Sequence, residues 1–126
     1  MALKVYEVEI ETSVQFIPEE SDENGSRYVF AYTITITNRS DIGIQLISRH
    51  WIITDANQQV QEVRGVGVVG EQPQLKPGQS FRYTSGTAIA TPVGTMKGEY
   101  RMVTDAGEHF EVAIPEFFLS TPRVLH

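Results

Sequence analysis

The chain has 126 residues and a formal net charge of -6, and this length predicts one domain spanning residues 1–126. The acidic balance disfavours direct nucleic-acid binding, which requires a basic patch that follows the phosphates. There is no cysteine, which excludes a disulfide scaffold, a thiolate nucleophile and a thiolate zinc site. No stretch approaches 18 apolar residues and no signal sequence opens the chain, so we expect a cytoplasmic protein without membrane insertion.

The first third of the chain predicts two long strands joined by a turn. Apolar and mostly acidic residues alternate over residues 4–16, a pattern typical of a half-buried strand with an acidic outer face. Asn24-Gly25 then predicts a turn that reverses the chain. The strand that follows, residues 28–37, carries aromatic and β-branched residues on its inner face.

The middle of the chain predicts further strands. Residues 44–54 are apolar at both odd and even positions, which fits either a central strand covered on both faces or a strand with a β-bulge. Residues 60–66 form a short predicted strand. Residues 81–85 alternate in another predicted strand, and Gly86 is expected to break it.

The last predicted pair of strands, residues 98–104 and 108–114, forms a hairpin around Asp105-Ala106-Gly107. No segment has a helical period, so the sequence predicts an all-β fold, an antiparallel immunoglobulin or fibronectin type III-like β-sandwich. The spacing around Tyr100 fits a tyrosine corner, and the alternative is a core tyrosine on a strand.

A glycine-rich segment follows the predicted strand at residues 60–66. Gly65, Gly67 and Gly70 match the dinucleotide-binding fingerprint, but the prolines that follow exclude the helix which that fingerprint requires. A reduced hypothesis is an anion-binding loop for pyrophosphate or a nucleotide, with Arg64 beside it. The alternative is that the glycines serve only the shape of an irregular loop, which is the outcome we favour.

Residues 48–51 bring a hydroxyl, a base and a large aromatic ring together. On a strand, Ser48 and His50 point to one face, and Arg49 and Trp51 point to the other. Ser-His catalysis is disfavoured here because no acid supports the pair and hydroxyl nucleophiles usually lie at sharp turns. Trp51 fits a core or interface aromatic residue, with Arg49 stacking or pairing nearby.

The candidate metal ligands are carboxylates. Glu7, Glu9 and Glu11 share one face of the first predicted strand, so weak binding of a divalent cation such as Mg²⁺ is physically allowed. The alternatives are a solvated charged face and protection of an edge strand against pairing with another chain. The three histidines lack the spacing of paired ligands.

Several segments resemble a known family. They are Ser48-Arg49-His50-Trp51-Ile52-Ile53-Thr54-Asp55-Ala56-Asn57, Val63-Arg64-Gly65-Val66-Gly67-Val68-Val69-Gly70-Glu71-Gln72-Pro73, Tyr83-Thr84-Ser85-Gly86, Thr91-Pro92, Gly94-Thr95-Met96, Gly98-Glu99-Tyr100 and Ile114-Pro115-Glu116-Phe117. With these segments nearly the whole chain resembles the bacterial ApaG family. One departure is Thr87-Ala88, where the family pattern often has Cys-Pro.

The resemblance implies a fibronectin type III-like β-sandwich and an association with cobalt and magnesium resistance or efflux. Related domains occur fused to F-box proteins and in a DNA-polymerase-delta-interacting protein, which implies a protein-interaction module. A pyrophosphate-binding role has been proposed for the family's glycine motif, and Gly65, Gly67 and Gly70 match that motif.

Together these observations predict a non-enzymatic binding module without a cofactor, whose partner is another protein. The candidate surface consists of Arg49, Trp51, Arg64 and the loop at residues 65–73. Any role in cobalt or magnesium efflux is expected to be indirect, because a soluble chain cannot itself carry an ion across a membrane. The alternative function is weak binding of pyrophosphate, a nucleotide or a divalent cation, by the glycine-rich loop or by the acidic first strand.

Overall fold

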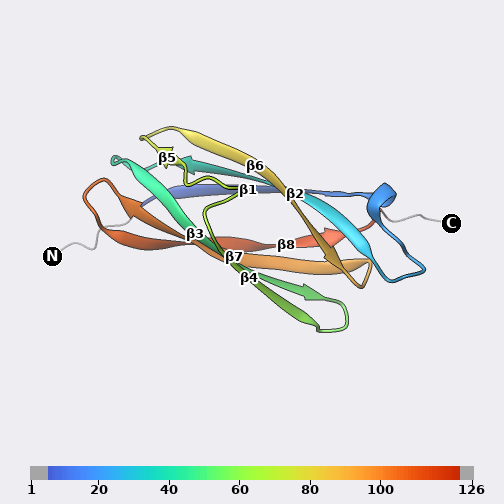
Figure 1. The fold of residues 1–126 in the computed structure, drawn as a ribbon. Coiled ribbons are helices and arrows are strands. Elements are labelled where there is room, and N and C mark those ends of the chain that lie inside the picture. The colour runs from blue at the N-terminus through green and yellow to red at the C-terminus, as the bar shows by residue number, and fades with distance from the viewer. Residues whose placement is uncertain (1–5, 123–126) are drawn as a thin grey trace.

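The computed structural model describes residues 6–122, whose regular secondary structure consists of β-strands apart from one short turn of helix (Figure 1). The strands are β1 (Val8–Phe16), β2 (Tyr28–Asn38), β3 (Ile44–Asp55), β4 (Val60–Val66), β5 (Gln74–Leu75), β6 (Ser80–Ile89), β7 (Val93–Thr104) and β8 (His109–Ser120). Within the described residues the helical structure is confined to one 3₁₀ turn, η1 (Pro18–Glu20). No helix in this part of the chain is long and apolar enough to cross a membrane.

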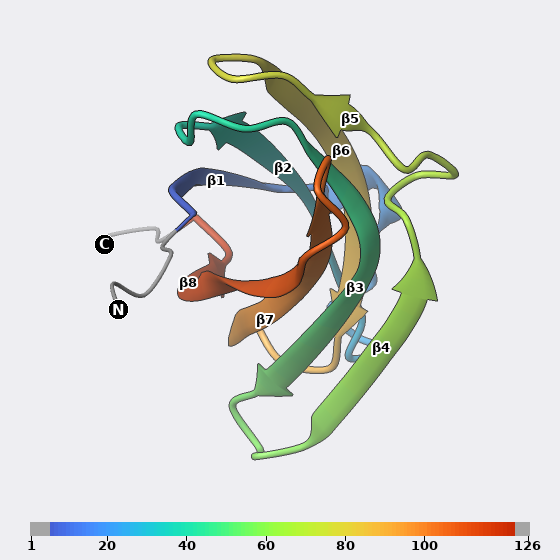
Figure 2. The same ribbon diagram turned by 90° about the vertical axis from the view of Figure 1, so that its left-hand side faces the viewer.

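The strands form two antiparallel sheets that face each other (Figure 2). One sheet has the order β1-β2-β6. The other has the order β4-β3-β7-β8, with the short strand β5 also paired to β3. This arrangement confirms the predicted all-β, antiparallel β-sandwich.

The core lies between the two sheets and is rich in aromatic rings. Trp51 on β3 is fully buried in it and makes edge-on contacts with the rings of Tyr32, Tyr100 and Phe117. Because both sheets contribute these rings, burial of the aromatic cluster stabilises the packing of one sheet on the other.

The predicted turn between the first two strands is present. β1 pairs with β2 along its whole length, from Val8 opposite Asn38 to Phe16 opposite Phe30. An isolated bridge between Asp22 and Arg27 closes the turn that contains Asn24-Gly25. The strand begins at Val8 rather than at residue 4, and residues 4 and 5 lie outside the described part of the chain.

For β3 the interpretation as a strand with a β-bulge is confirmed, whereas cover on both faces is wrong, because Ser48 and His50 line a depression on the outer face of its sheet. β3 is a central strand, paired with β4 on one side and with β7 on the other. It also carries a bulge between Leu46 and Ser48. Ile44 and Leu46 are buried before the bulge, whereas Trp51 and Ile53 are buried after it, so the inward-facing positions change from even to odd.

One detail of the predicted strands is wrong. β6 continues through Gly86, which pairs with Ala31 inside the ladder, so this glycine does not break the strand. Of the two interpretations of Tyr100, the core tyrosine on a strand is confirmed, because its side chain is buried and its hydroxyl is bonded to the hydroxyl of Tyr83. The predicted hairpin is confirmed, with Met102 opposite Phe110, and its two strands are longer than expected.

Candidate functional site

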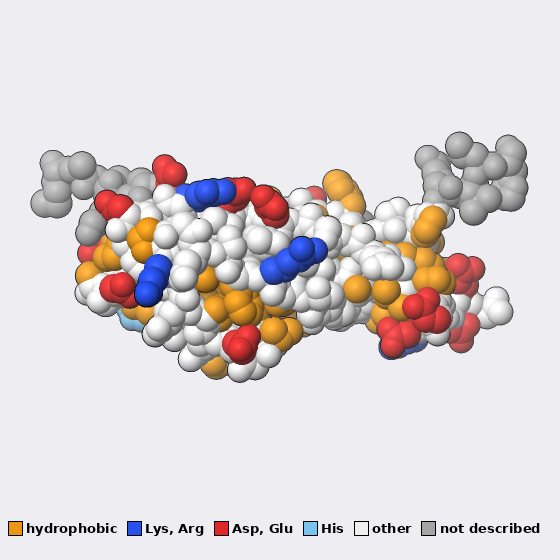
Figure 3. All heavy atoms as spheres, turned by 90° about the horizontal axis from the view of Figure 1, so that it is seen from above, with side chains coloured by type: hydrophobic (Ala, Val, Ile, Leu, Met, Phe, Trp, Pro, Cys, Tyr) orange, Lys and Arg blue, Asp and Glu red, His pale blue; other side chains and the backbone are white. Residues whose placement is uncertain are grey.

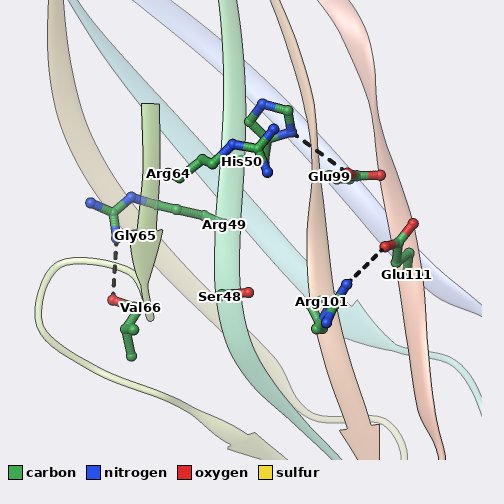
Figure 4. Close-up of a pocket in the computed structure, with 9 residues that line it drawn as sticks. All are labelled: Ser48, Arg49, His50, Arg64, Gly65, Val66, Glu99, Arg101 and Glu111. Carbon is green, nitrogen blue, oxygen red and sulfur yellow. Dashed lines mark hydrogen bonds and ion pairs between the residues drawn. The ribbon is translucent and has the colours of Figure 1, made fainter. Parts of the chain in front are cut away.

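A depression on the outer face of the β4-β3-β7-β8 sheet has a volume of about 430 Å³. Figure 4 shows the residues around it. They are Ser48, Arg49, His50, Arg64, Gly65, Val66, Glu99, Arg101 and Glu111. The strand register explains the assembly, because His50 lies opposite Arg64 on one side and opposite Glu99 on the other.

His50 lies between two carboxylates. Its Nε2 is 3.2 Å from Glu62 Oε1 and its Nδ1 is 3.6 Å from Glu99 Oε1. The side chain is only 16% exposed, so its position is well defined. Ser48 lines the same depression, but no hydrogen bond joins it to His50 among the contacts of the described residues. Both imidazole nitrogens therefore face an acid, and neither is arranged to take a proton from a serine hydroxyl.

The remaining charged side chains of this face are exposed. Arg101 Nη2 lies 3.4 Å from Glu111 Oε1, and the two side chains are 59% and 54% exposed. Arg64 is also exposed and makes no hydrogen bond or ion pair with another described residue. In Figure 4 its side chain extends toward His50 and away from the glycine-rich loop. We call His50, Arg64, Glu99, Arg101 and Glu111 the charged face.

Arg49 points to the other side of the sheet, as predicted from alternation, and it organises the glycine-rich segment. Its Nη1 donates hydrogen bonds to the carbonyl oxygens of Val66, at 3.2 Å, and Gly67, at 2.8 Å. A Cβ atom on Gly65 would lie 2.6 Å from that guanidinium. A side chain at position 65 would therefore displace the guanidinium from this place, and Arg49 rather than Arg64 is the cation at this segment.

Trp51 does not lie on a partner surface. Its side chain is 1% exposed and belongs to the hydrophobic core, which corrects its assignment to the candidate surface. The bulge in β3 is the physical reason, because it turns the odd-numbered residues that follow toward the opposite sheet. Of the three residues predicted for the partner surface, only Arg64 lies on the charged face.

The glycine-rich loop uses its backbone groups internally. The N–H of Gly67 donates to the Ile47 carbonyl at 2.8 Å, and Val68 and Glu71 exchange hydrogen bonds across a tight turn. Both central residues of that turn, Val69 and Gly70, have positive φ angles, which favours glycine. Gly67 also has a positive φ, and a Cβ there would lie 2.3 Å from the Glu71 carbonyl oxygen. The glycines thus have structural roles that account for them without an anion.

The acidic first strand forms no cluster of metal ligands. No group of three or more His, Asp or Glu residues within residues 6–122 is arranged to hold a metal ion, and this includes Glu7, Glu9 and Glu11. Glu9 instead accepts a 2.9 Å hydrogen bond from Arg39, which lowers the pKa of its carboxyl group. β1 lies at the edge of its sheet, so these charges are placed where they oppose pairing with another chain.

Acidic and basic side chains are interspersed on the face of the molecule shown in Figure 3. The basic side chains visible there are few and separated from one another. A protein that binds the phosphate backbone of a nucleic acid needs several neighbouring positive charges. This face does not present such a basic surface.

Three residues of the charged face were missed by sequence reasoning: Glu99, Arg101 and Glu111. On β7, Glu99 and Arg101 alternate with the buried Tyr100 and Met102, but a single strand cannot reveal which residues of other strands lie across from it. The register between strands supplies that information, because Arg101 lies opposite Ser48 of β3 on one side and opposite Glu111 of β8 on the other.

Comparison with known proteins agrees with the residues and the fold described above. The model of the ApaG domain matches residues 18–104. The chain is 60% identical over 121 residues to Protein ApaG of Dechloromonas aromatica, covering 96% of this chain and 95% of that protein. It is 58% identical over 126 residues to Protein ApaG of Chromobacterium violaceum, covering 100% of both.

A solved structure is also similar. The crystal structure of the ApaA protein from Bordetella pertussis superposes with a TM-score of 0.92 at 51% sequence identity, covering 98% of this chain and 100% of that one. The sequence and the architecture thus lead to the same result: the chain belongs to the ApaG family.

Proposed function

We propose that this protein is a non-enzymatic module that binds another protein through the charged face. The observation that carries the proposal is the gathering of exposed charges of both signs from β4, β7 and β8, next to His50 of β3, around one depression. Charges arranged in this way favour a partner with a complementary pattern and disfavour one of a single sign. The exposed side chain of Val66, 73% accessible at the rim, adds apolar area.

The arrangement of His50 supports binding rather than catalysis. Its two nitrogens face Glu62 and Glu99, and no hydroxyl is bonded to it among the described residues. An activated nucleophile would need a base within hydrogen-bonding reach. The proposed role of His50 is to hold the two carboxylates in place for a partner.

In this proposal, the family's association with cobalt and magnesium resistance is explained by the activity of the bound partner. We propose that the protein acts on ion homeostasis indirectly, by binding a transporter or a protein that regulates one. The ion pair of Glu9 with Arg39 and the lack of a ligand cluster in residues 6–122 support an indirect rather than a direct role.

The proposal is tested by site-specific crosslinking followed by a binding measurement. A photo-crosslinking residue at position 101 or 111, on the charged face, should capture a partner in cells, whereas the same residue at position 82, on β6 of the other sheet, should not. Affinity of the purified partner is then measured by calorimetry. Arg101→Glu should weaken binding by about tenfold, and Arg82→Glu should leave it unchanged.

Two results would contradict the proposal. One is equal crosslinking from positions 82 and 101, which would remove the charged face from consideration. The other is a partner that binds Arg101→Glu and the unaltered protein with the same affinity. Both variants replace an exposed arginine with glutamate, so a difference between them reports the location of the charge rather than the net charge.

A further inference from the structure

The outer edge of β4 is open. β4 is the terminal strand of its sheet, and it lies at the margin of the molecule in both ribbon views (Figures 1 and 2). All its residues except Gly65 are exposed. Val60, Val63 and Val66 are 59%, 38% and 73% accessible. An edge strand without proline or lysine presents unpaired backbone groups to any strand that can match it.

The direction of the unpaired groups follows from the ladder with β3. Asp55 N–H donates to Gln59 and Gly67 N–H donates to Ile47 at the two ends of the pairing. Hydrogen-bonded pairs alternate in an antiparallel ladder, so the odd-numbered residues of β4 bond to β3. The backbone groups of the even-numbered residues therefore point outward, and these residues are Val60, Glu62, Arg64 and Val66.

We propose that β4 pairs antiparallel with β4 of a second copy of this chain, around a two-fold axis at Val63. In that register Glu62 lies opposite the second copy's Arg64, and Val60 lies opposite its Val66. Each outward-pointing residue then faces another outward-pointing residue, as the hydrogen bonds require. Each charge faces an opposite charge, and each valine faces a valine.

Charge favours this register over those shifted by two residues. A shift of two residues one way places Glu62 opposite the second copy's Glu62, and a shift the other way places Arg64 opposite Arg64. Like charges directly across a ladder are destabilising. Shifts by one residue pair outward groups with inward groups and lose the hydrogen bonds. The seven residues of β4 are thus complementary to themselves, as a two-fold interface demands.

The side chains at the axis are compatible with close approach. Val63 points its backbone groups toward β3, so the two copies of Val63 form the closer, non-hydrogen-bonded type of pair. The Val66 carbonyl already accepts a 3.2 Å bond from Arg49, and its second lone pair stays available. The result would be one continuous sheet through both subunits. This interface uses the edge of the sheet, whereas the proposed binding of a partner uses its face.

The test is the oligomeric state of the whole chain, measured by sedimentation velocity over a range of concentrations. We expect a reversible dimer. Arg64→Glu should raise its dissociation constant by about tenfold or more, because two like-charged pairs replace two opposite-charged ones. The exchanged variant Glu62→Arg with Arg64→Glu restores opposite charges and should recover dimerisation to within about threefold. Arg82→Glu, on β6, is the matched control and should behave as the unaltered protein.

Amide hydrogen exchange tells this dimer from any other. The outward amides of Glu62 and Arg64 should exchange more slowly at concentrations that favour the dimer, whereas the Val63 amide, already bonded to β3, should not change. A chain that stays monomeric up to about 1 mM overturns the proposal, because an interface with matched hydrogen bonds and matched charges should have a dissociation constant below that concentration. A dimer in which the Glu62 and Arg64 amides stay unprotected, or which Arg64→Glu and Arg82→Glu weaken equally, also overturns it. Because Arg101 lies two strands from this edge, failure here leaves the crosslinking result at position 101 unaffected.

Discussion

The hydroxyl groups of Tyr83 and Tyr100 lie 2.5 Å apart in the core and join the two sheets by a hydrogen bond. Tyr83 belongs to β6 and Tyr100 to β7, and both side chains are buried. Immunoglobulin domains commonly tie their two sheets with a disulfide at the core. This cysteine-free chain has a polar link between its sheets instead.

The first prediction concerns that link. Tyr83→Phe leaves the buried Tyr100 hydroxyl without its partner and should lower the free energy of unfolding by about 1–3 kcal/mol. The double variant Tyr83→Phe with Tyr100→Phe removes both polar groups and should lose less than the sum of the two single losses. Urea denaturation of the four proteins measures the coupling, and strictly additive losses would contradict it.

The second prediction concerns alkaline pH. Burial, which removes the phenolate from water, raises the pKa of Tyr83 and Tyr100 well above the ordinary value. The unfolded chain therefore loses these protons near its own pKa of about 10, while the folded chain keeps them. The contribution of these two tyrosines to the free energy of unfolding is therefore fully present below about pH 10, and the free energy of unfolding should fall as the pH rises above that value.

Urea denaturation between about pH 8 and pH 11 measures this fall. The control is the double phenylalanine variant, whose free energy of unfolding should decline less steeply. A second contribution of the same sign comes from Tyr6, because its hydrogen bond to Glu108 raises the pKa of Tyr6 to about 12. Equal slopes for the double variant and the unaltered protein would show that the buried pair does not set the alkaline limit.

The third prediction separates two roles of glycine in the loop. Gly67 and Gly70 both have positive φ angles, but only Gly67 lies against the Glu71 carbonyl. Gly70→Ala should therefore cost only the conformational penalty of about 1–2 kcal/mol. Gly67→Ala adds a steric clash and should cost about 2–4 kcal/mol. Thermal unfolding of both variants checks the order, and an equal loss would mean that the contact with Glu71 relaxes without cost.

The fourth prediction concerns Trp51, the single tryptophan of the chain. Its fluorescence should be blue-shifted and resistant to quenching by iodide, because the ring is 1% exposed. Trp51→Ala should destabilise the fold by about 3–5 kcal/mol. Trp51→Phe should cost less, since it keeps a ring and removes an indole N–H that has no partner in the described structure. Emission at the wavelength of an exposed indole would contradict the core position.

Most of the fold could be predicted from the sequence because alternation is a local signal. The inner residues of β2, such as Phe30 and Ile34, were recognised from their spacing alone. Gly86 misled the prediction for a physical reason: it pairs with Ala31 within the β2–β6 ladder, and a glycine inside a strand gives the same local signal as one that ends it.

The candidate site was less predictable because it depends on register between strands distant in sequence. Arg101 and Glu111 meet through the β7–β8 hairpin, which the sequence indicated, but their approach to His50 requires the pairing of β3 with β7. The role of Arg49 was also hidden, because its contact with the Gly67 carbonyl depends on where a loop runs in three dimensions.

The bulge between Leu46 and Ser48 separates β3 into two segments with opposite phase. Before it, even-numbered residues fill the core, and after it the even-numbered Ser48 and His50 face outward. Without the extra residue, the even-numbered residues would face the core along the whole strand. With it, Trp51 faces the core and His50 faces outward. Loss of that residue would turn Trp51 toward the outer face and His50 toward the core. Core packing and the charged face therefore depend on the same β-bulge.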